Sequence, residues 1–378
     1  MSDVPLGLYI HWPYCARICP YCDFNVYKAR GADDALFEAL LADLDHWAGQ
    51  IGSRPLVSLH FGGGTPSLLA GPQIARLIAR AADRFGFAAG AEIGLEANPN
   101  DAERFGDFAA AGIKRLSLGV QSFQDDALAA LGRDHDAASA RRSLDLARRQ
   151  FGSVSLDLIY AREGQTVAGW ERELAEVLEL RPDHLSTYQL TIELGTAFER
   201  RVARGELVPP EDDLAAQLYN VTQSMCEAAG LSGYEISNHA RAGHESRHNR
   251  LYWEGGDWIG IGPGAHGRIG SHAAGGRLSS TTAPRPADYS QRVAAQGTGS
   301  DVETLSALDE ARERILMGLR VAEGMDIDAL LAATGLAPDR DEAVRFRQQG
   351  LLAQRQDRLV LTPEGRLYAD GIAAALCP

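Results

Sequence analysis

Short apolar runs alternate with helix-length segments through the first half of this chain. Six runs are strand-like: residues 6–10, 56–61, 92–97, 115–119, 154–159 and 184–190. Between them, apolar residues recur at helical spacing, as in the series Leu36, Leu40, Leu41, Leu44 and Trp47. The pattern therefore predicts strands and helices in alternation as far as residue 190.

Such alternation is typical of parallel strands joined by right-handed crossovers. A complete eight-stranded barrel takes about 250 residues, whereas the pattern here fades after the sixth unit, near Leu190. We predict an α/β fold built on an open partial barrel, (βα)6. In folds of this kind, ligands bind where the carboxyl ends of the strands meet.

The rest of the chain has a different pattern. Residues 305–320 predict an amphipathic helix, further helices are expected near 327–333 and 341–349, and residues 351–361 resemble a hairpin. Three helices followed by a hairpin resemble a winged helix. We predict three domains: the partial barrel at 1–190, a barrel extension with an exposed loop (270–286) at 191–300, and a winged-helix-like domain at 301–378.

Length and charge narrow the classes of function. With 378 residues, 45% of them hydrophobic, the chain can bury a large core. A net charge of -14 argues against nucleic-acid binding, because phosphate contacts need clustered Lys and Arg. The sequence has neither a signal-peptide core nor an apolar run of the ~20 residues that a membrane span needs. We expect a cytoplasmic protein without a transmembrane segment, which leaves peripheral membrane contact open.

Three of the five cysteines lie within eight residues, at Cys15, Cys19 and Cys22, directly after the first predicted strand. Thiolates at this density usually hold a metal or a cluster, and three ligands leave one iron of a 4Fe-4S cube open. Zinc is a weaker alternative, because structural zinc takes four protein ligands and no Cys/His pair follows at zinc-finger spacing. Inert buried thiols are the remaining alternative. We predict a 4Fe-4S cluster on these cysteines.

Glycines and polar residues follow the other predicted strands. The glycine-rich stretch 62–66 would let backbone amides approach a ligand closely, although a flexible turn is the alternative. Asp157 lies among aliphatic residues of the fifth strand, where a buried carboxylate needs a partner such as a pair of ribose hydroxyls. Arg133 offers a planar fork of donors that suits a carboxylate such as that of methionine.

The spacing Cys-x3-Cys-x2-Cys, with Tyr21 before the third cysteine, resembles the signature of the radical S-adenosylmethionine (SAM) superfamily. In that superfamily the amino and carboxylate groups of SAM chelate the open iron. One electron from the reduced cluster then splits the sulfonium to give a 5'-deoxyadenosyl radical. The resemblance independently implies the partial-barrel fold, but it names a chemistry and not a substrate.

Longer motifs narrow the resemblance to one family. The stretches Leu-Tyr-Ile-His-Trp-Pro, Cys-Pro-Tyr-Cys-Asp-Phe-Asn, Gly-Gly-Gly-Thr-Pro-Ser, Glu-Ala-Asn-Pro and Leu-Gly-Val-Gln-Ser-Phe look like the oxygen-independent coproporphyrinogen III oxidase-like radical SAM proteins. The match extends over essentially the whole chain. Carried over by motif, it implies that SAM is surrounded by Tyr9, Tyr21, Gly63, Gly64, Thr65, Glu96, Gln121, Arg133 and Asp157.

Two branches of that family differ in readable ways. The coproporphyrinogen dehydrogenases carry a fourth cysteine two residues after the third, and an N-terminal extension ahead of the cluster. This chain has Phe24 at that position, and its first cysteine is already residue 15. Both features resemble the haem-chaperone branch instead, as does the motif His-Asn-x-x-Tyr-Trp at residues 248–253.

The resemblance makes His248 the candidate haem ligand. A neutral imidazole is a common axial ligand of haem iron, and the adjacent aromatic residues offer flat apolar surface for a porphyrin. A packing motif that closes the barrel is the alternative. Other histidines nearby are His239, His244 and His266, of which the last could instead approach the cofactor.

The resemblance thus implies a haem chaperone that binds haem, a 4Fe-4S cluster and SAM, and delivers haem to acceptor haemoproteins. The acceptors and the electron donor are not identified by the sequence, and no catalytic residue is assigned. An oxygen-independent coproporphyrinogen III dehydrogenase, or another radical SAM enzyme of tetrapyrrole chemistry, is the alternative. One departure stands out: residues 161–165 read Ala-Arg-Glu-Gly-Gln where the family usually has Gly-Leu-Pro-Gly-Gln, which adds charge near the expected cofactor pocket.

Overall fold

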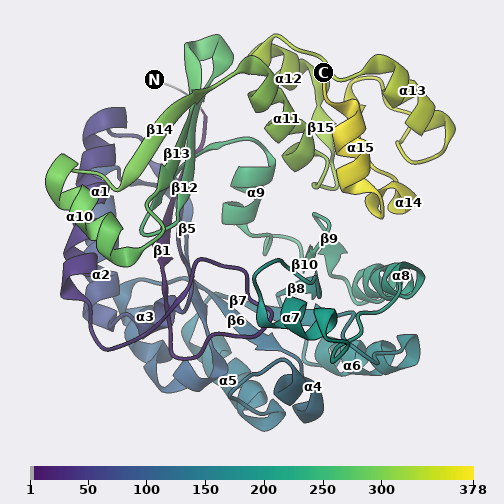
Figure 1. Ribbon diagram of the computed structural model, residues 1–378, viewed down its shortest axis with the longest axis horizontal. Helices are drawn as coiled ribbons and strands as arrows, with labels where there is room; N and C mark the ends of the chain where they lie inside the picture. Colours follow the sequence, from purple (N-terminus) through teal and green to yellow (C-terminus); the bar gives the residue numbers. More distant parts are fainter. Residues whose placement is uncertain (1–3) are drawn as a thin grey trace.

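The computed structural model describes residues 4–378, and a sheet of 12 strands runs through most of it (Figure 1). Six parallel strands form its centre, in sequence order. They are β1 (Leu6–Trp12), β4 (Leu56–Gly63), β5 (Phe87–Ala97), β6 (Arg115–Gln121), β7 (Ser153–Tyr160) and β8 (His184–Gln189). The predicted (βα)6 partial barrel is confirmed.

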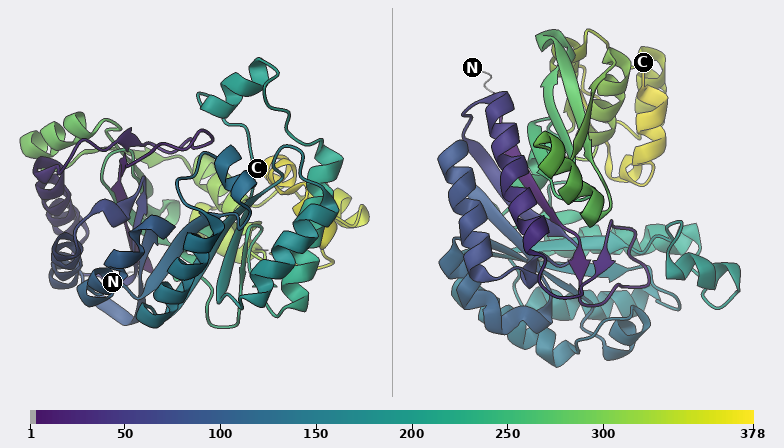
Figure 2. Two further views of the ribbon diagram at one scale, coloured as in Figure 1. Left: turned by 90° about the horizontal axis from the view of Figure 1, so that it is seen from below. Right: turned by 60° about the vertical axis from the view of Figure 1, so that its left-hand side comes forward.

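Helices cover the outer face of these strands, as the side views of Figure 2 show. They are α1 (Asp34–Ile51), α2 (Gly71–Arg84), α3 (Phe105–Ala111), α4 (Asp125–Ala130), α5 (Ala137–Gln150), α6 (Val167–Glu179) and α8 (Asp212–Ala228). Strand side chains alternate between the two faces. In β1, Leu8 and Ile10 join the hydrophobic core, whereas Tyr9 and His11 hydrogen-bond to each other on the opposite, inner face.

The sheet continues beyond the barrel at both edges. Next to β8 lie β10 (Asn238–Ala240) and β9 (Ser232–Gly233), while β11 (Asp257–Ile261) pairs in parallel with β1. Three antiparallel strands follow β11: β12 (His266–Ser271), β13 (Gly276–Thr282) and β14 (Ser300–Leu305). We predicted that the strand pattern ends after six strands. The structure adds a seventh parallel strand, β11, which pairs with β1 although the two are far apart in the sequence.

The prediction of an exposed loop at 270–286 is wrong, because this stretch contains the end of β12, all of β13 and the start of α10 (Pro286–Gln296). Its polar composition misled the sequence analysis. Arg277, Ser279, Ser280 and Thr282 are all buried. Two of these side chains have backbone partners: Arg277 donates to the carbonyl of Gly270 at 2.8 Å, and Thr282 Oγ1 donates to the carbonyl of Gly262 at 2.5 Å. Polar residues are stable inside a sheet when they are hydrogen-bonded.

Helix α9 (Arg247–Trp253) closes the amino-terminal end of the barrel (Figure 1). The Glu92 carboxylate in the middle of β5 accepts hydrogen bonds from the backbone N–H groups of Arg247 (3.1 Å) and His248 (3.2 Å), as suits a helix N-terminus. A Cβ atom at Gly7 would lie only 2.3 Å from Leu251 Cδ2. Glycine at this position therefore allows the helix to pack against the first strand.

Residues 307–376 form a separate hydrophobic core, in which Ile315, Leu330, Phe346 and Leu359 are buried. The predicted helices are present, and Leu352 pairs with Leu361 across the predicted hairpin, which confirms the winged-helix-like pattern. The elements are α11 (Ala307–Gly318), β15 (Met325–Asp326), α12 (Ile327–Thr334), α13 (Arg340–Gln348), β16 (Arg358–Leu359), α14 (Pro363–Arg366) and α15 (Ala369–Leu376). The last two helices were not predicted.

The remaining elements are short. They are β2 (Tyr14–Cys15), β3 (Tyr27–Lys28), α7 (Ala197–Ala203) and three 3-10 turns at Pro66–Leu68, Pro99–Arg104 and His272–Ala274. Within residues 4–378, no helix combines the length and the apolar character that crossing a membrane requires.

Candidate functional site

The three clustered cysteines lie on one loop after β1. Strands β2 and β3 pair in parallel and close this loop, and the backbone N–H of Cys22 donates to the Cys19 carbonyl at 3.2 Å. Burial raises the pKa of the Cys15 thiol, and it raises the pKa of Cys22 to about 11. Both thiols are therefore protonated at neutral pH, although the nearby Arg133 acts in the opposite direction on the pKa of Cys15. Binding as thiolates requires a metal whose charge displaces the protons.

The donor set on this loop fits a cluster better than a single ion. Among residues 4–378, no three His, Cys, Asp or Glu side chains converge closely enough to share one metal ion. A tetrahedral zinc site needs sulfur ligands about 2.3 Å from one point. A 4Fe-4S cube has its irons at separate corners, and each corner takes its own thiolate. This loop supplies three thiols, which match three corners of such a cube, whereas structural zinc takes four protein ligands.

Arg133 is held against the cysteine loop. Its Nη1 donates to Cys19 Sγ at 3.1 Å, and its Nη2 donates to the Gly119 carbonyl at 2.9 Å and to the Asn98 side chain. The Gln121 side chain lies on the same side of β6, because a Cβ atom at Gly119 would meet Gln121 Nε2 at 3.1 Å and Arg133 Nη2 at 3.7 Å. A carboxylate bound beside Cys19 would meet these donors.

The glycine-rich stretch after β4 passes directly beneath the cysteine loop. The Thr65 N–H donates to the Tyr14 carbonyl at 2.8 Å. A Cβ atom at Gly64 would lie 2.8 Å from the same carbonyl, and Gly63 has a φ of +108°. Glycine is therefore required for the close approach of two backbones. The close approach of a ligand to this stretch stays a prediction.

A polar cavity of about 70 Å³ lies inside the barrel. Glu96 from β5 and Asp157 from β7 both line it. Glu96 accepts hydrogen bonds from the Gly63 N–H at 3.2 Å and from His60 Nε2 at 3.3 Å, and Asp157 accepts from Ser117 Oγ at 2.9 Å. Burial raises the pKa of Asp157 to about 6, against the effect of its serine hydrogen bonds. The fold thus brings together two carboxylates that are 61 positions apart in the printed sequence.

Tyr21 and Tyr9 lie in different surroundings. The Tyr21 ring is on the cysteine loop, with its centroid 6.1 Å from that of Phe198. Tyr9 lies deeper in the barrel, where its hydroxyl is 3.1 Å from His11 Nδ1 and its ring faces His60 and His248. Of the residues expected around SAM, Tyr9 is therefore placed nearest to the barrel floor.

His248 lies on that floor and is only 4% exposed. Its ring stacks on His60 with centroids 4.3 Å apart, Tyr252 packs edge-on against it, and its Nδ1 is 3.4 Å from Ser58 Oγ. Burial, helped by the neighbouring His60, lowers the pKa of His248 well below its usual value, so the imidazole is neutral. These contacts are the ones expected of a packing motif that closes the barrel. Its role as a haem ligand stays a prediction, and it requires α9 to move.

The alternative histidines differ in accessibility. His239 is fully buried, and burial lowers its pKa to about 4. His244 is half-buried and lies 3.4 Å from Ser153 Oγ. His266 is exposed. Of these three, only His266 could meet a large ligand without rearrangement.

Asn25 anchors the cysteine loop, a role that the sequence analysis missed. Its side-chain amide donates to the carbonyls of Pro263 (2.9 Å) and Pro284 (2.8 Å), and its own carbonyl lies 3.0 Å from His11 Nε2. The only signal in the sequence was its position in the Cys-Asp-Phe-Asn motif. The partners come from a segment more than 230 residues away, and local pattern does not reveal such contacts.

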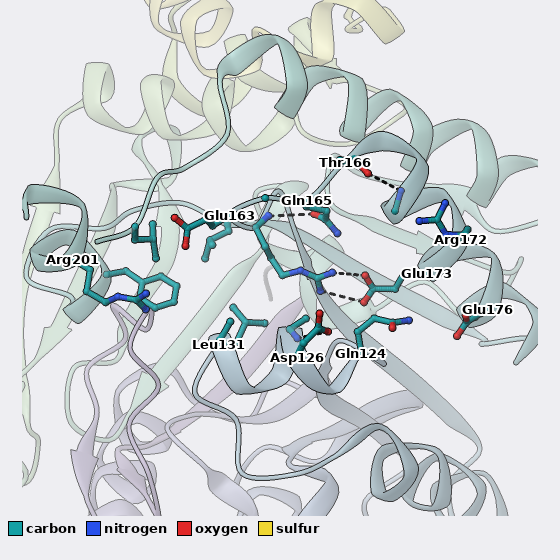
Figure 3. Close-up of a pocket in the computed structure, with 18 residues that line it drawn as sticks. Gln124, Asp126, Leu131, Glu163, Gln165, Thr166, Arg172, Glu173, Glu176 and Arg201 are labelled. Atoms are coloured by element: carbon teal, nitrogen blue, oxygen red, sulfur yellow. Dashed lines mark hydrogen bonds and ion pairs between the residues drawn. The ribbon is translucent and has the colours of Figure 1, made fainter. Parts of the chain in front are cut away.

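The loop at 161–165, where the sequence departs from its family, has a clear structure. Ala161 has a φ of +58°, a conformation that glycine adopts without strain. Arg162 forms a two-pronged ion pair with the buried carboxylate of Glu173, which also accepts a hydrogen bond from Ser122 Oγ at 2.5 Å. The loop also borders a cavity of about 450 Å³ on the flank of the barrel (Figure 3).

Comparisons with known proteins agree with this geometry. The family described as the radical SAM superfamily matches residues 9–177, and the HemN C-terminal domain family matches residues 305–368. The heme chaperone HemW of Mycobacterium tuberculosis is 38% identical, with 100% of this chain and 96% of that protein aligned. HemW of Escherichia coli is also 38% identical, with 97% of each chain aligned.

Two further relatives extend the comparison. The mitochondrial radical S-adenosyl methionine domain-containing protein 1 of Bos taurus is 37% identical over 98% of this chain and 87% of its own length. Among solved structures, the coproporphyrinogen III oxidase HemN of Escherichia coli, described as a radical SAM enzyme, superimposes with a TM-score of 0.82. It is 26% identical, and the match covers 99% of this chain and 90% of that one.

Proposed function

Because the chain belongs to the HemW family of radical SAM proteins, we propose that it is a haem chaperone, which binds haem and a 4Fe-4S cluster and delivers haem to acceptor haemoproteins. The full-length identity to two chaperones, 38%, carries this proposal, since the identity to the oxidase HemN is 26%. Phe24 supports it as well. This side chain is exposed on the cysteine loop, where it cannot bind iron in place of a fourth cysteine.

In this proposal Cys15, Cys19 and Cys22 hold the cluster. The bound cluster, when reduced, supplies an electron to SAM. The chain's own groups position that cosubstrate: Arg133 beside Cys19 offers donors to a carboxylate, and Asp157 accepts hydrogen bonds from hydroxyl groups in its ionised form. The loop tied down by Asn25 holds Cys19 beside Arg133 at the carboxyl ends of the strands.

Haem is the proposed cargo, and acceptor haemoproteins and an electron donor are the proposed partners. A reducing compartment, the cytoplasm, is the proposed location, and the five free cysteines support it. The competing function is oxygen-independent coproporphyrinogen III dehydrogenase, which the likeness of the fold to HemN favours. The two functions differ in what happens to the tetrapyrrole, because a chaperone returns it unchanged.

In the test, the cluster-loaded protein is mixed either with haem or with coproporphyrinogen III. SAM and a reductant are present in each case. We expect haem to bind with a shifted Soret band, and we expect no protoporphyrinogen IX from coproporphyrinogen III. Formation of protoporphyrinogen IX would establish the competing function. Absence of haem binding would end the chaperone proposal.

A further inference from the structure

A row of hydrogen-bonded side chains leads from Asp157, in the polar cavity of the barrel, to helix α9. Ser155 Oγ is 3.4 Å from Asp157 Oδ1 and 2.6 Å from His184 Nδ1. On the other side of the imidazole, His184 Nε2 is 2.9 Å from Tyr234 Oη. The side-chain amide of Asn249, on α9, donates to the same hydroxyl group at 3.4 Å. The row therefore joins β7, β8, the segment after β9 and α9.

The three middle members of this row are shielded from water. Ser155 and His184 are each 1% exposed, and Tyr234 is 5% exposed. Burial lowers the pKa of His184 well below its usual value, so the imidazole is neutral. A neutral imidazole has one nitrogen that donates a hydrogen bond and one that accepts. The position of its single proton therefore decides the direction of the whole row.

The start of α9 sets that direction. Tyr234 Oη accepts a hydrogen bond from the Asn249 side chain and another from the backbone N–H of Ser246, the N-cap residue of α9. These two bonds occupy the lone pairs of the phenol oxygen, so its proton is the group that faces His184. Tyr234 therefore donates to Nε2, and the imidazole proton lies on Nδ1, from which it is donated to Ser155.

Ser155 accepts from the imidazole and directs its own proton to another acceptor. Two acceptors lie within reach, because Asp157 Oδ1 and Ser186 Oγ are both 3.4 Å away. The ionised carboxylate is the stronger of the two, since hydrogen bonds to a charged group are roughly twice as strong as neutral ones. Ser117 and Ser186 also stabilise the ionised form of Asp157. Ser155 differs from them because His184 sets the direction of its hydroxyl group.

We infer that Ser155, His184 and Tyr234 are positioning residues of the SAM site, an inference that rests on the proposed function, in which Asp157 accepts hydrogen bonds from hydroxyl groups of SAM. They act through Asp157, because the directed hydroxyl proton of Ser155 favours the ionised carboxylate and fixes its orientation. The helix that sets the direction also carries His248. A movement of α9 would remove both donors to Tyr234 and so weaken SAM binding.

The experiment measures the Kd of SAM for the full-length, cluster-loaded protein by calorimetry, from about pH 5 to about pH 8. Asp157 titrates within this range, because burial raises its pKa to about 6. Below that pH the carboxyl group is protonated, and SAM should bind less tightly. The α-amino group of SAM titrates near pH 8 in every case, so each variant is compared with the unmodified protein at the same pH. Other titratable or charged groups facing this row stay unchanged in all variants: His60, Glu96, Arg115, Tyr188 and Glu235.

Two variants interrupt the row at different points. Ser155→Ala removes the hydroxyl group that faces Asp157, and Tyr234→Phe removes the proton that keeps the imidazole donating to Ser155. We expect each to raise the pH at which SAM binding weakens by roughly half a unit, because the ionised carboxylate loses a hydrogen bond. The Kd near pH 8 should rise about threefold.

The matched controls are Ser143→Ala and Tyr160→Phe. Ser143 is a buried serine of α5, and Tyr160 is a buried tyrosine of β7. Within residues 4–378, the Tyr160 hydroxyl group has no hydrogen-bond partner, and its ring stacks on Trp170. We expect both controls to bind SAM with the affinity and pH profile of the unmodified protein.

The double variant Ser155→Ala with Tyr234→Phe distinguishes a directed row from a general loosening of the site. Tyr234 acts on Asp157 only through Ser155, so the double variant should match Ser155→Ala in both Kd and pH profile. Effects that add would overturn the inference, as would an unchanged profile in either single variant. If the unmodified protein binds no SAM, the SAM site of the proposed function itself fails.

Discussion

At Asp157, burial and hydrogen bonding shift the pKa of the carboxyl group in opposite directions. Burial raises its pKa to about 6, although Ser186 and Ser117 stabilise the ionised form. In the unfolded chain the pKa is about 3.9. The folded state therefore binds the proton more tightly, and the stability of the protein falls as pH rises from about 4 to about 6. At neutral pH the ionised Asp157 is a cost to the fold, which ligand hydroxyls would reduce.

We predict that Asp157→Asn raises the free energy of unfolding of the cluster-free protein by about 1–2 kcal/mol near neutral pH. This is less than a shift of about two pKa units implies, because the Asp157 residue is only partly buried. The gain should disappear near pH 4, where the aspartic acid is protonated as well. Urea unfolding at the two pH values measures the effect, with the exposed Asp301→Asn as control. An equal change at both pH values would contradict the assigned pKa.

Ala161 is one of three non-glycine residues with positive φ among residues 4–378. Its φ of +58° brings Cβ too close to the backbone, a strain of about 1–2 kcal/mol. The residue is fully buried at the end of β7, so the surrounding structure holds it in this conformation. The strain comes from the Cβ atom of alanine, because the glycine typical of the family would adopt this conformation freely.

We predict that Ala161→Gly stabilises the protein by about 0.5–1 kcal/mol, because the relief of strain exceeds the entropy cost of glycine in the unfolded chain. The same substitution at Ala140, inside α5 and equally buried, should destabilise by about 1 kcal/mol. Thermal unfolding of the two variants compares them directly. A loss of stability in Ala161→Gly would show that the position carries no strain.

The loop between β7 and α6 shows how a helix accommodates a charged substitution. Arg162 stands where the family usually has leucine, and its guanidinium pairs with Glu173 on the first turns of α6. Glu173 is 3% exposed and also binds Ser122 on the neighbouring loop. The ion pair with Glu173 therefore neutralises the positive charge of Arg162 within the wall of the 450 Å³ cavity on the flank of the barrel.

We predict that Arg162→Leu destabilises the protein by about 3 kcal/mol, because it leaves the buried Glu173 carboxylate without a cation. The double variant Arg162→Leu with Glu173→Gln should recover most of that loss, since it removes the unpaired charge. Urea unfolding of both single variants and the double variant gives the coupling energy. A double variant whose loss of stability equals the sum of the two single losses would show that the pair is not coupled.

At the scale of the whole molecule, one buried carboxylate connects the barrel to the strands added at its edge. Asp257, at the start of β11, is 1% exposed. It pairs with Arg54 at 2.8 Å and Arg277 at 3.7 Å, and it accepts the Gly270 N–H at 3.0 Å. Burial, together with the nearby Arg314, lowers the pKa of Arg277 to about 10. Two cations from separate segments thus depend on one anion.

We predict that Asp257→Ala lowers the free energy of unfolding by about 3–5 kcal/mol, because Arg277 would remain buried without its partner. Asp301→Ala is the control, since its ion pair with Arg292 is exposed and should contribute less than about 1 kcal/mol. Urea unfolding monitored by tryptophan fluorescence compares the two. Equal effects of the two substitutions would show that the edge strands do not depend on Asp257.

The sequence by itself determined the features that depend on residues close together in the chain, namely the barrel strands, the helices and the cysteine cluster. The six barrel strands appear as apolar runs because both faces of a parallel strand are buried, and the helices between them repeat at 3.6 residues. Cys15, Cys19 and Cys22 are close because the chain itself keeps them close. The C-terminal helices α11 to α13 were readable for the same reason, since each has its own apolar face.

Only the tertiary structure decided what depends on contacts between distant segments. Strand β11 pairs with β1, although about 250 residues separate them in the sequence. Arg277 is buried in β13 because the fold places the Asp257 carboxylate 3.7 Å from it. His248 is on the barrel floor because Glu92 binds the start of α9. A sequence pattern records how one residue alternates with its neighbours. It does not record which polar group from elsewhere will satisfy a buried charge, and that decided where each of these side chains lies.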